Sequence, residues 1–599
     1  MTLVGLLGWE TARQHAANEE IQVTQLLPEK SEDFGYVSSD ACRACHPSQY
    51  ASWHQSYHRT MTQIATPDTV LGRFDGVPFA IDGRHYRVSR RGDEFWMEVP
   101  DPSWQGPKNK APSVELRTRL VSGSHTLQAY WFSGTVDRHL YLAPLTWIIE
   151  DQKWVERKDA LVFDPERPPK EVSTWNGDCI QCHATGGQPR FLVDPTTQAV
   201  KVDTRVGELG IACEACHGPG HEHVLANQDP IRRYGLHFGD GQDPTIVEPR
   251  RLTQQKAMQI CSVCHAVQLI ADSRAFLSTG IQFRPGQETN PSQILIRALE
   301  APSKPELAAF LSVPGAIEMR FWPDGPSRPV GREVSSLIES KCYQGGLTCL
   351  NCHSMHNGSR SKQVAPEMDT DKACASCHPD LVKDAAAHSH HRAGSSGAAC
   401  SSCHMPPTTF GQMRGNRNHF IESPNPAKTL ATGRPNACNV CHLDRTMAWT
   451  VEQMNAWYGT PKIELDEDER QVSATVLQLL KGDALQRAIA SASLGWAPAQ
   501  EASGTDWIAP YLGVLMRDSY AVVRYRAYAS LRTLPGYQGF EFDYVGPVAE
   551  REQGSARVLQ QWKRSAANPA LLIGPDGLEQ ELIDRLLARR DNRSIILLE

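Results

Sequence analysis

The feature that most constrains this chain is a short pattern, C-x-x-C-H, in which two cysteines three positions apart are followed at once by a histidine. One copy reads "GDCIQCHATGG" at 177–187, and the pattern occurs eight times in the 599 residues. Its cysteines are Cys42, Cys45, Cys179, Cys182, Cys213, Cys216, Cys261, Cys264, Cys349, Cys352, Cys374, Cys377, Cys400, Cys403, Cys438 and Cys441. Its histidines are His46, His183, His217, His265, His353, His378, His404 and His442.

This pattern is typical of a c-type haem attachment site. Residues i and i+3 face the same way on one helical turn, so both thiols can form thioethers with the two vinyl groups of one haem. The following histidine then points its imidazole at the iron as the proximal ligand. A zinc site would need two C-x-x-C units close together without a histidine after each, and a thioredoxin-like redox pair would not recur eight times. The repeats therefore predict eight covalently bound haem c groups.

Cysteine usage agrees with this interpretation, because the eight motifs use all but one of the 17 cysteines. The remaining one is Cys342, in "ESKCYQGGLTCLNCH". We expect it to be a buried, inert thiol; the alternative is a structural contact to the haem at Cys349 and Cys352.

Charge and composition restrict the class of protein further. The formal net charge is −7, and each haem would add two propionates, so a nucleic-acid partner, which needs a basic face, is not expected. Haem c is attached outside the cytoplasm, which predicts a periplasmic or extracellular location. The N-terminus "MTLVGLLGWETARQHAANEE" has no basic region and only a short apolar run, so we interpret it as a truncated or misassigned signal peptide, a remnant of one, or a short anchor. No stretch of 18 apolar residues is present.

The distribution of motifs and apolar patterns predicts seven segments. Alternating residues in "FAIDGRHYRVSRRGDEFWMEV" favour β-hairpins, and "MRFWPDGPSRPVG" favours a hairpin around Asp324-Gly325. The segments are an N-terminal stretch (1–35), a first haem segment (36–67), a β-rich insert (68–170), haems two to four (171–290), a linker with a hairpin (291–335), haems five to eight (336–446) and a helical region (447–599).

Helical periodicity dominates after Trp449, where cysteines no longer occur. Two similar helix pairs there suggest HEAT-like repeats, too few for a free-standing solenoid, so this region should pack on the haem-bearing part or on a partner. The expected fold class is a multihaem cytochrome c, mainly α and loop around stacked haems, with a β-rich insert and a C-terminal α-helical HEAT-like domain. The porphyrins themselves would supply much of the core.

The second axial ligand of each iron decides between two functions. A second histidine gives a saturated electron carrier, whereas an empty position gives a place for substrate. Of the 22 histidines, 14 lie outside the motifs. These are His15, His54, His58, His85, His125, His139, His221, His223, His237, His356, His388, His390, His391 and His419.

Here the sequence resembles known families over most of 40–445. "YASWHQSYH" and "CEACHGPGHEH" resemble the tetrahaem shuttle cytochromes of ammonia oxidisers and the octahaem group around hydroxylamine oxidoreductase. "CLNCHSMH" resembles multihaem reductases, and "HSHHRAGSSGAACSSCHMP" with "RNHF" resembles the pentahaem nitrite reductase tail and a wide set of bacterial multihaem cytochromes, as does "SGSHTLQAYW". The resemblance implies distal ligands at His58, His125, His223, His356, His388 or His390, and His419, with His391 close enough to replace His390.

The sequence also departs from these enzymes. All eight motifs end in histidine, whereas ammonia-forming nitrite reductases carry a lysine at the catalytic haem, and no tyrosine can be assigned to the cross-link of hydroxylamine oxidoreductases. We therefore expect electron relay to or from other cytochromes, a quinol-oxidising membrane complex or an extracellular acceptor, with self-assembly as a further option.

The alternative is an oxidoreductase of a nitrogen or sulfur oxo-species at one open haem. About two haems lack an evident distal ligand, and His54 or His139 could serve one of them. The insert residues Arg84, His85 and Arg87 could line a substrate pocket, or simply form a solvated hairpin face. A third option is a structural or sensing role for the helical region, with the haems relaying redox state.

Overall fold

The structure of the chain is a computed structural model. It describes residues 26–597 except 102–103, 105, 108–109, 135, 167–172, 240 and 302–303, so most of the N-terminal segment interpreted as a signal or anchor lies outside the described residues. The chain forms two compact units. Unit 1 comprises residues 1–157, 170–296 and 346–369; unit 2 comprises 158–169, 297–345 and 370–599.

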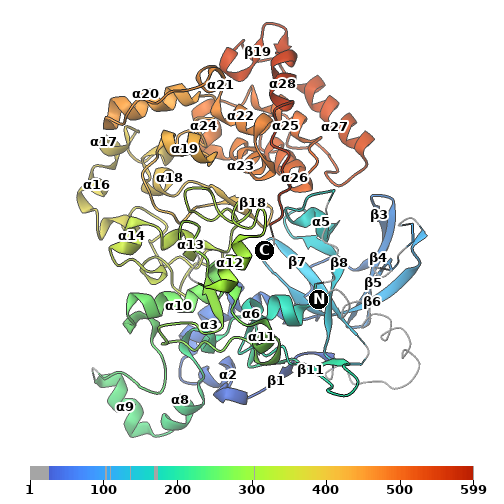
Figure 1. The fold of residues 1–599 in the computed structure, drawn as a ribbon, viewed down its shortest axis with the longest axis vertical. Helices are drawn as coiled ribbons and strands as arrows, with labels where there is room; N and C mark the ends of the chain where they lie inside the picture. The colour runs from blue at the N-terminus through green and yellow to red at the C-terminus, as the bar shows by residue number, and fades with distance from the viewer. Residues whose placement is uncertain are drawn as a thin grey trace. The chain divides into compact units, whose positions relative to one another are not determined.

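An antiparallel sheet is the largest regular element of unit 1 (Figure 1). Its strands follow one another in sequence order from β3 to β9, and β2 pairs with β6. The strands are β2 (Thr62–Ile64), β3 (Asp75–Ile81), β4 (Arg84–Arg91), β5 (Glu94–Pro100), β6 (Ser113–Ser122), β7 (Leu127–Ser133), β8 (Leu140–Ile148) and β9 (Lys153–Glu156).

The alternating sequence explains why these segments are strands. In β5, Phe95, Met97 and Val99 are buried while the residues between them are not. Successive side chains of a strand point to opposite faces, so this alternation places one apolar face in a core. Burying each such side chain contributes roughly 1.5–3 kcal/mol. The predicted β-rich part is therefore present, beginning at Thr62.

The rest of unit 1 consists of short helices and two-stranded pairs that surround five of the C-x-x-C-H motifs. The helices are α2 (Ser39–Cys42), α3 (Pro47–His54), α4 (Tyr57–Thr60), α6 (Ile180–His183), α7 (Cys213–His217), α8 (His221–Ala226), α9 (Pro230–Phe238), α10 (Gln254–His265) and α11 (Ser273–Thr279), with single turns at Asp33–Gly35, Trp175–Cys179, Pro249–Arg251 and Cys349–Asn351. The small strands are β1 (Glu29–Lys30), β10 (Ala184–Thr185), β11 (Phe191–Val193), β12 (Val200–Val202), β13 (Arg205–Val206), β14 (Glu208–Leu209), β15 (Gln268–Ile270) and β16 (Gln293–Leu295). Helix α5 (Arg157–Ala160) lies at the boundary between the units.

A cluster of buried apolar side chains lies behind the second motif and ties it to the sheet. Ile180 lies within the motif, and Leu120 and Trp131 come from β6 and β7. Trp175 precedes the motif in a wide helical turn and is fully buried. The sheet thus fixes the backbone of the second motif.

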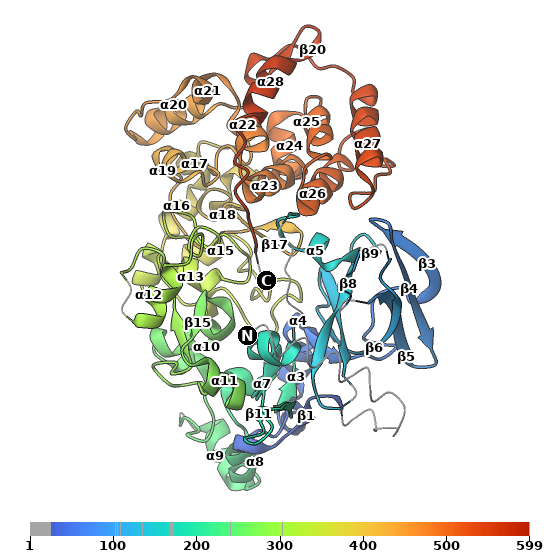
Figure 2. The ribbon, with the colours of Figure 1, turned by 45° about the vertical axis from the view of Figure 1, so that its right-hand side comes forward.

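Unit 2 carries the last three motifs and the long helices of the C-terminal region (Figure 2). Its earlier elements are α12 (Pro305–Leu311), α13 (Glu333–Leu337), α14 (Lys341–Gln344), α15 (Lys372–Ala375), α16 (Pro379–Lys383), α17 (Ala385–Ser389), α18 (Cys400–His404), α19 (Pro426–Thr432), the hairpin β17–β18 (Thr409–Gly411, Arg414–Asn416) and a turn at Ser396–Ala398. The C-terminal elements are α20 (Met447–Tyr458), α21 (Glu467–Gln471), α22 (Ala474–Lys481), α23 (Ala484–Leu494), α24 (Ala497–Ser503), α25 (Ile508–Leu515), α26 (Ala521–Leu531), α27 (Val548–Gln561), α28 (Gln580–Leu587), a turn at Pro569–Leu571 and the pair β19–β20 (Ile573–Gly574, Gly577–Leu578).

The C-terminal helices pack on the eighth motif. The Ser503 hydroxyl at the end of α24 donates to the carbonyl of Cys441 at 2.9 Å and accepts from the amide of Leu443 at 2.8 Å. Thr475 on α22 donates to the carbonyl of Asn439 at 2.9 Å. The helical region therefore forms one structure with the haem-bearing segment.

Two features differ from, or refine, the sequence expectations. The fifth motif lies in unit 1, although the sequence groups it with motifs six to eight. Around Asp324-Gly325 the chain makes a tight turn, in which the Trp322 amide donates to the carbonyl of Pro326 at 2.8 Å. Within the described residues, no helix has the length and apolar character that crossing a bilayer requires.

Candidate haem-binding centres

Each motif forms one helical turn that brings its histidine back over its first cysteine. The backbone N–H of His46 donates to the carbonyl of Cys42 at 2.9 Å, and the same bond joins His353 to Cys349 at 2.8 Å. Such i to i+4 bonds define the α-helical turn, in which both cysteines share a face. The local backbone thus has the form that thioether attachment requires.

Five motif histidines each face the imidazole ring of a histidine from outside the motifs. The pairs are His46 with His223, with ring centres 6.2 Å apart; His265 with His58, 6.2 Å; His217 with His356, 5.9 Å; His404 with His388, 6.3 Å; and His442 with His391, 5.9 Å.

These separations fit a metal ion between the rings. An imidazole nitrogen binds a metal at about 2.0 Å and its ring centre lies about 1.1 Å further away, so two rings on opposite sides of one iron are about 6 Å apart. The chain also supplies two thiols beside each motif imidazole. The donor set and its spacing therefore fit haem c with two histidine ligands.

Burial keeps the imidazoles in the form that binds iron. Burial lowers the pKa of His58 to about 4, and it also lowers the pKa of His46, His217 and His356. A neutral imidazole has the lone pair that a metal needs.

Backbone carbonyls orient three of the motif imidazoles through Nδ1. His217 contacts the carbonyl of Val247 at 2.7 Å, His404 that of Glu422 at 2.9 Å, and His353 that of Lys362 at 3.1 Å. A hydrogen bond at one ring nitrogen leaves Nε2 for the metal and fixes the ring orientation.

His223 has a carboxylate partner instead. Its Nδ1 lies 3.1 Å from Oδ2 of Asp243, which also accepts from Asn227 at 2.9 Å, while Oδ1 of Asp243 accepts from Arg232 at 2.7 Å. Burial alone would raise the pKa of Asp243, but hydrogen bonds from Thr245 and Asn227 and the charge of Arg232 lower it well below its usual value. This carboxylate is therefore ionised and holds His223 toward His46.

Four distal candidates from the sequence, His58, His223, His356 and His388, lie in these pairs. His390 does not lie opposite a motif histidine in them, because its ring stacks on Trp457 with centres 4.7 Å apart. The neighbouring His391 faces His442 instead, and which of these histidines binds iron stays a prediction. His390 has φ of 56°, a left-handed turn that points the two neighbouring side chains in different directions.

The other candidates have different surroundings. His125 stacks on Tyr57 with ring centres 4.3 Å apart, and the guanidinium of Arg360 lies 4.9 Å from the same Tyr57 ring. His419 Nδ1 lies 3.2 Å from the carbonyl of Arg417. Two reserve candidates lie against tyrosines, His54 against Tyr50 and His139 against Tyr141.

The second motif is built differently from the five paired ones. His183 Nδ1 lies 2.8 Å from the Thr62 hydroxyl in β2, and burial lowers its pKa to about 4. Within the described part of the chain, no histidine ring lies opposite it at the spacing of the five pairs. His378 of the sixth motif likewise has no histidine ring opposite it at that spacing within the described residues, and its side chain is exposed.

Cysteines of different motifs also lie next to one another. The thiols of Cys42 and Cys213 are within hydrogen-bond reach, as are those of Cys261 and Cys349 in unit 1. In unit 2 the same holds for Cys374 and Cys400. Because each cysteine would hold the edge of one porphyrin, these contacts would keep the attachment sites of neighbouring haems close together.

One orphaned group near the second motif also fits a bound haem. The indole N–H of Trp175 is fully buried and has no acceptor among the described residues. A buried donor without a partner is costly, so an acceptor from a bound group is expected there. Cys179, at the end of the same turn, has its pKa raised to about 12 by burial, so its thiol is protonated when no haem is attached.

The β-rich insert contains a cavity at the residues that the sequence offers as a pocket lining, but its arginines are paired with acidic side chains. A cavity of about 210 Å³ is lined by Arg84, His85 and Arg87 among others. Arg84 pairs with Glu156, and Arg87 lies 3.6 Å from Glu98. Because the arginines have acidic partners, these residues are better interpreted as a solvated hairpin face than as a substrate pocket. Cys342 is half-buried rather than fully buried, and burial raises its pKa; that it is an inert thiol stays a prediction.

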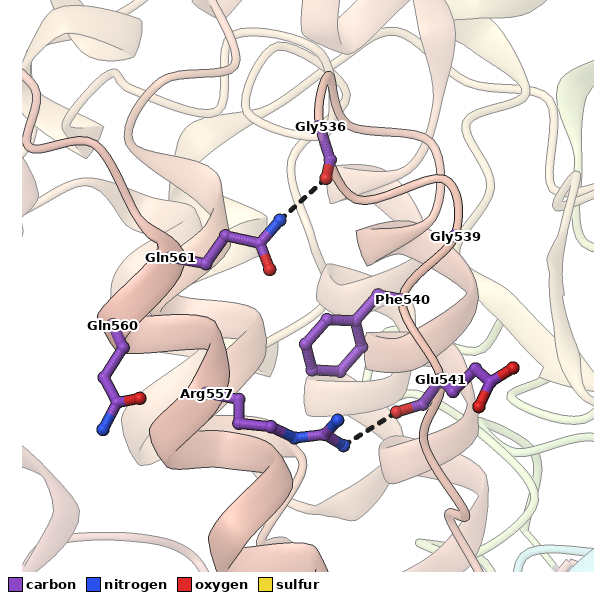
Figure 3. A pocket seen from close by; sticks show the side chains of 7 residues that line it. All are labelled: Gly536, Gly539, Phe540, Glu541, Arg557, Gln560 and Gln561. Carbon is purple, nitrogen blue, oxygen red and sulfur yellow. Dashed lines mark hydrogen bonds between the residues drawn. The ribbon is translucent and has the colours of Figure 1, made fainter.

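A second hollow lies in the C-terminal helical region (Figure 3). It measures about 630 Å³ and lies beside α27. The guanidinium of Arg557 lies 5.0 Å from the Phe540 ring and donates to the carbonyl of Glu541 at 2.9 Å, while Gln561 donates to the carbonyl of Gly536 at 2.8 Å. The side chains of Arg557 and Gln561 are thus already engaged by the chain itself.

Comparison with known proteins supports the general class. The family model "Cytochrome c554 and c-prime" matches residues 152–218, which include the second and third motifs. An outer cell wall cytochrome, OcwA, is similar with 16% identity and a TM-score of 0.47, over 83% of this chain and 99% of that one. The octahaem sulfite reductase MccA of Wolinella succinogenes is similar with 12% identity and a TM-score of 0.29, over 90% and 86%. A search of curated proteins finds no match. The motifs and the family match together support a multihaem c-type cytochrome.

Proposed function

We propose that this chain is an exported octahaem c-type cytochrome that passes electrons along its haems in periplasmic or extracellular respiration. The observation that carries the proposal is the set of five imidazole pairs, each joining a motif histidine to a histidine from elsewhere at 5.9–6.3 Å. Two strong-field histidines saturate an iron, and a saturated iron exchanges electrons without binding substrate.

The chain's residues have three tasks in this function. The paired imidazoles would hold five of the irons, and Nδ1 partners such as Val247 and Asp243 fix the ring orientation. Bound haem c would supply one-electron redox chemistry, which the axial ligands and the surroundings tune. The adjacent motif cysteines keep neighbouring haem edges close, which favours transfer between them.

The proposal has a simple test of cofactor content. The pyridine haemochrome spectrum and the intact mass of the exported protein should both give eight haems for each chain. Changing Cys342 to Ser leaves all motifs intact and should leave the count at eight, which makes it a matched control. A count of five or fewer in the native protein would contradict the proposal.

A second candidate function rests on the second motif. His183 is half-buried and held by Thr62, but it has no opposing histidine ring within the described residues. It would thus hold its iron from one side only and leave the other side to a small ligand. This favours, as the alternative, an oxidoreductase of a nitrogen or sulfur oxo-species at this centre.

The alternative is tested by ligand binding to the reduced protein. Carbon monoxide should bind at the centre of the second motif, and nitrite, hydroxylamine or sulfite should shift the high-spin signal of the oxidised form. If neither ligand binding nor a high-spin signal is seen, the alternative fails and the relay function stands alone.

Three further expectations remain proposals. Other cytochromes or a quinol-oxidising membrane complex would be the redox partners. The helices from α20 to α28 would be HEAT-like repeats, and their packing on the eighth motif supports a role in bracing that centre. The further distal candidates His125 and His419 would serve centres outside the five pairs.

A further inference from the structure

The β-rich insert reaches the second motif through the start of strand β2. The hydroxyl oxygen of Thr62 lies 2.8 Å from Nδ1 of His183. The carbonyl of Met61, the preceding residue, is a further hydrogen-bond partner of the same imidazole. When Nε2 of an imidazole binds iron, Nδ1 carries the hydrogen and donates it, so the Thr62 hydroxyl would accept. The insert therefore holds the ring that would bind the second iron.

Strand register places a second hydroxyl behind the first. Thr62 and Ser122 face each other across the antiparallel pair β2–β6, with their hydroxyl oxygens 3.4 Å apart. The indole N–H of Trp131 in β7 donates to Ser122 Oγ at 2.9 Å. Thr62, Ser122 and Trp131 are only 1%, 6% and 3% exposed, so solvent has little access to these contacts. A buried polar chain thus runs from the middle of the sheet to His183.

This partner differs in kind from those of the other imidazoles. His217, His404 and His353 have backbone carbonyls at Nδ1. His223 has the carboxylate of Asp243. Thr62 instead offers a neutral side chain, which a substitution can remove while the backbone stays in place.

The Nδ1 partner sets how much charge an imidazole donates to its iron. A stronger acceptor makes the imidazole a more basic ligand, which stabilises Fe(III) and lowers the reduction potential. A hydroxyl is a weaker acceptor than a carboxylate because it carries no charge. His183 would therefore donate less charge than a carboxylate-bound imidazole, and more than an imidazole without this partner.

We propose that the β-rich insert sets the reduction potential of the second centre, with Thr62 as the positioning residue that acts through His183. The inference rests on the haem loading proposed above. The hydroxyl turns Nε2 toward the iron and keeps this centre easier to reduce than a carboxylate partner would. The insert thereby favours an electron resting at the centre where, among the described residues, no histidine ring opposes the motif histidine.

Contacts independent of the Thr62 side chain keep the second motif folded in a variant. The carbonyl of His183 accepts from the amide of Gly210 at 3.0 Å, and Ile180 and Trp175 are fully buried in the apolar cluster behind the motif. Changing Thr62 to Val keeps the β-branched shape and removes only the hydroxyl. Thr60→Val is the matched control, because the Thr60 hydroxyl lies 2.7 Å from Ser124 Oγ and not at His183.

A potentiometric titration of the haem-loaded full chain, followed by optical spectroscopy and electron paramagnetic resonance, tests the inference. T62V should shift one of the eight one-electron steps to a higher potential and leave the other seven unchanged, because the imidazole loses an acceptor. T62S restores the hydroxyl and should titrate as the wild type does, and so should T60V. T62A makes the same test if T62V binds fewer than eight haems.

Three results would overturn the inference: T62V titrating as the wild type does, T60V shifting a step as far as T62V, or T62S shifting it as T62V does, which would assign the role of Thr62 to packing. Loss of one haem in both T62V and T62A, with the other seven steps unchanged, would leave Thr62 a part of the attachment site only. A wild type with five or fewer haems would contradict the octahaem function itself, so the two failures are distinguishable.

Discussion

At the scale of single residues, His390 and His391 are chemically identical neighbours whose surroundings separate them. His391 faces His442 at 5.9 Å, whereas His390 stacks on Trp457. Changing His391 to Ala should leave one iron without its second ligand and convert that one haem to a form that binds carbon monoxide. Changing His390 to Ala should leave the spectrum unchanged. The carbon monoxide difference spectrum of the reduced proteins measures both, and an opposite result would exchange the two roles.

The sequence predicts the motif cysteines and histidines better than the histidines that face them, and the reason is physical. A motif cysteine and its histidine lie on one helical turn, so their relation is local and can be read from spacing. The opposing histidines come from segments distant in sequence, as His58 does for His265, and only the fold brings them together. Between His390 and His391 the choice depends on one left-handed backbone turn, for which "HSHH" contains no signal.

At the scale of elements, a buried ion pair joins α23 to the turn that precedes α26, and this pair should control the stability of the C-terminal helices. Arg487 donates to Asp518 at 2.7 and 3.0 Å, and both side chains are almost fully buried. Burial alone would raise the pKa of Asp518, but the charge and hydrogen bonds of Arg487 lower it. A lowered carboxyl pKa contributes stability above the unfolded value, about 3.9, and that contribution is lost as pH falls through the folded value.

Changing Asp518 to Asn should therefore destabilise these helices at neutral pH by about 3–5 kcal/mol, because Arg487 is left buried without a counter-charge. Hydrogen exchange should show the amides of α23 and α26 exchanging about a hundredfold faster or more. Changing Asp591, the partner of the half-exposed Arg593, to Asn should cost no more than about 1 kcal/mol. If Asp518→Asn and Asp591→Asn lower the free energy of unfolding equally, the buried Arg487–Asp518 pair contributes no more than an exposed ion pair.

The sequence predicted the strands and helices in which apolar residues recur at a regular spacing. The strand alternation of β5 follows from side chains that point to opposite faces, and the helices after Trp449 follow from a regular apolar period. The short helices around the motifs lack such a period, because haems rather than side chains would complete their core. The fifth motif was grouped with its sequence neighbours, whereas non-local contacts such as that of Cys349 with Met258 at 3.7 Å hold it in unit 1.

At the scale of the whole molecule, we propose that the five imidazole pairs are the axial ligands of five irons. The angle between the two imidazole planes differs from pair to pair, and electron paramagnetic resonance is sensitive to that angle. Four pairs have interplanar angles of 2°, 7°, 25° and 33°, and the His58–His265 pair has 76°. Near-parallel imidazoles give rhombic low-spin signals in electron paramagnetic resonance, and near-perpendicular ones give a highly anisotropic low-spin signal.

Low-temperature electron paramagnetic resonance of the fully oxidised, haem-loaded protein therefore tests the central claim most directly. The predicted spectrum is mainly low-spin, with several rhombic components and a highly anisotropic one that disappears when His58 is changed to Ala. A minor high-spin component would support the alternative function proposed for the second motif, where His183 has no opposing histidine ring among the described residues. A spectrum dominated by high-spin iron, or one in which H58A leaves the anisotropic component intact, would contradict the ligation described here.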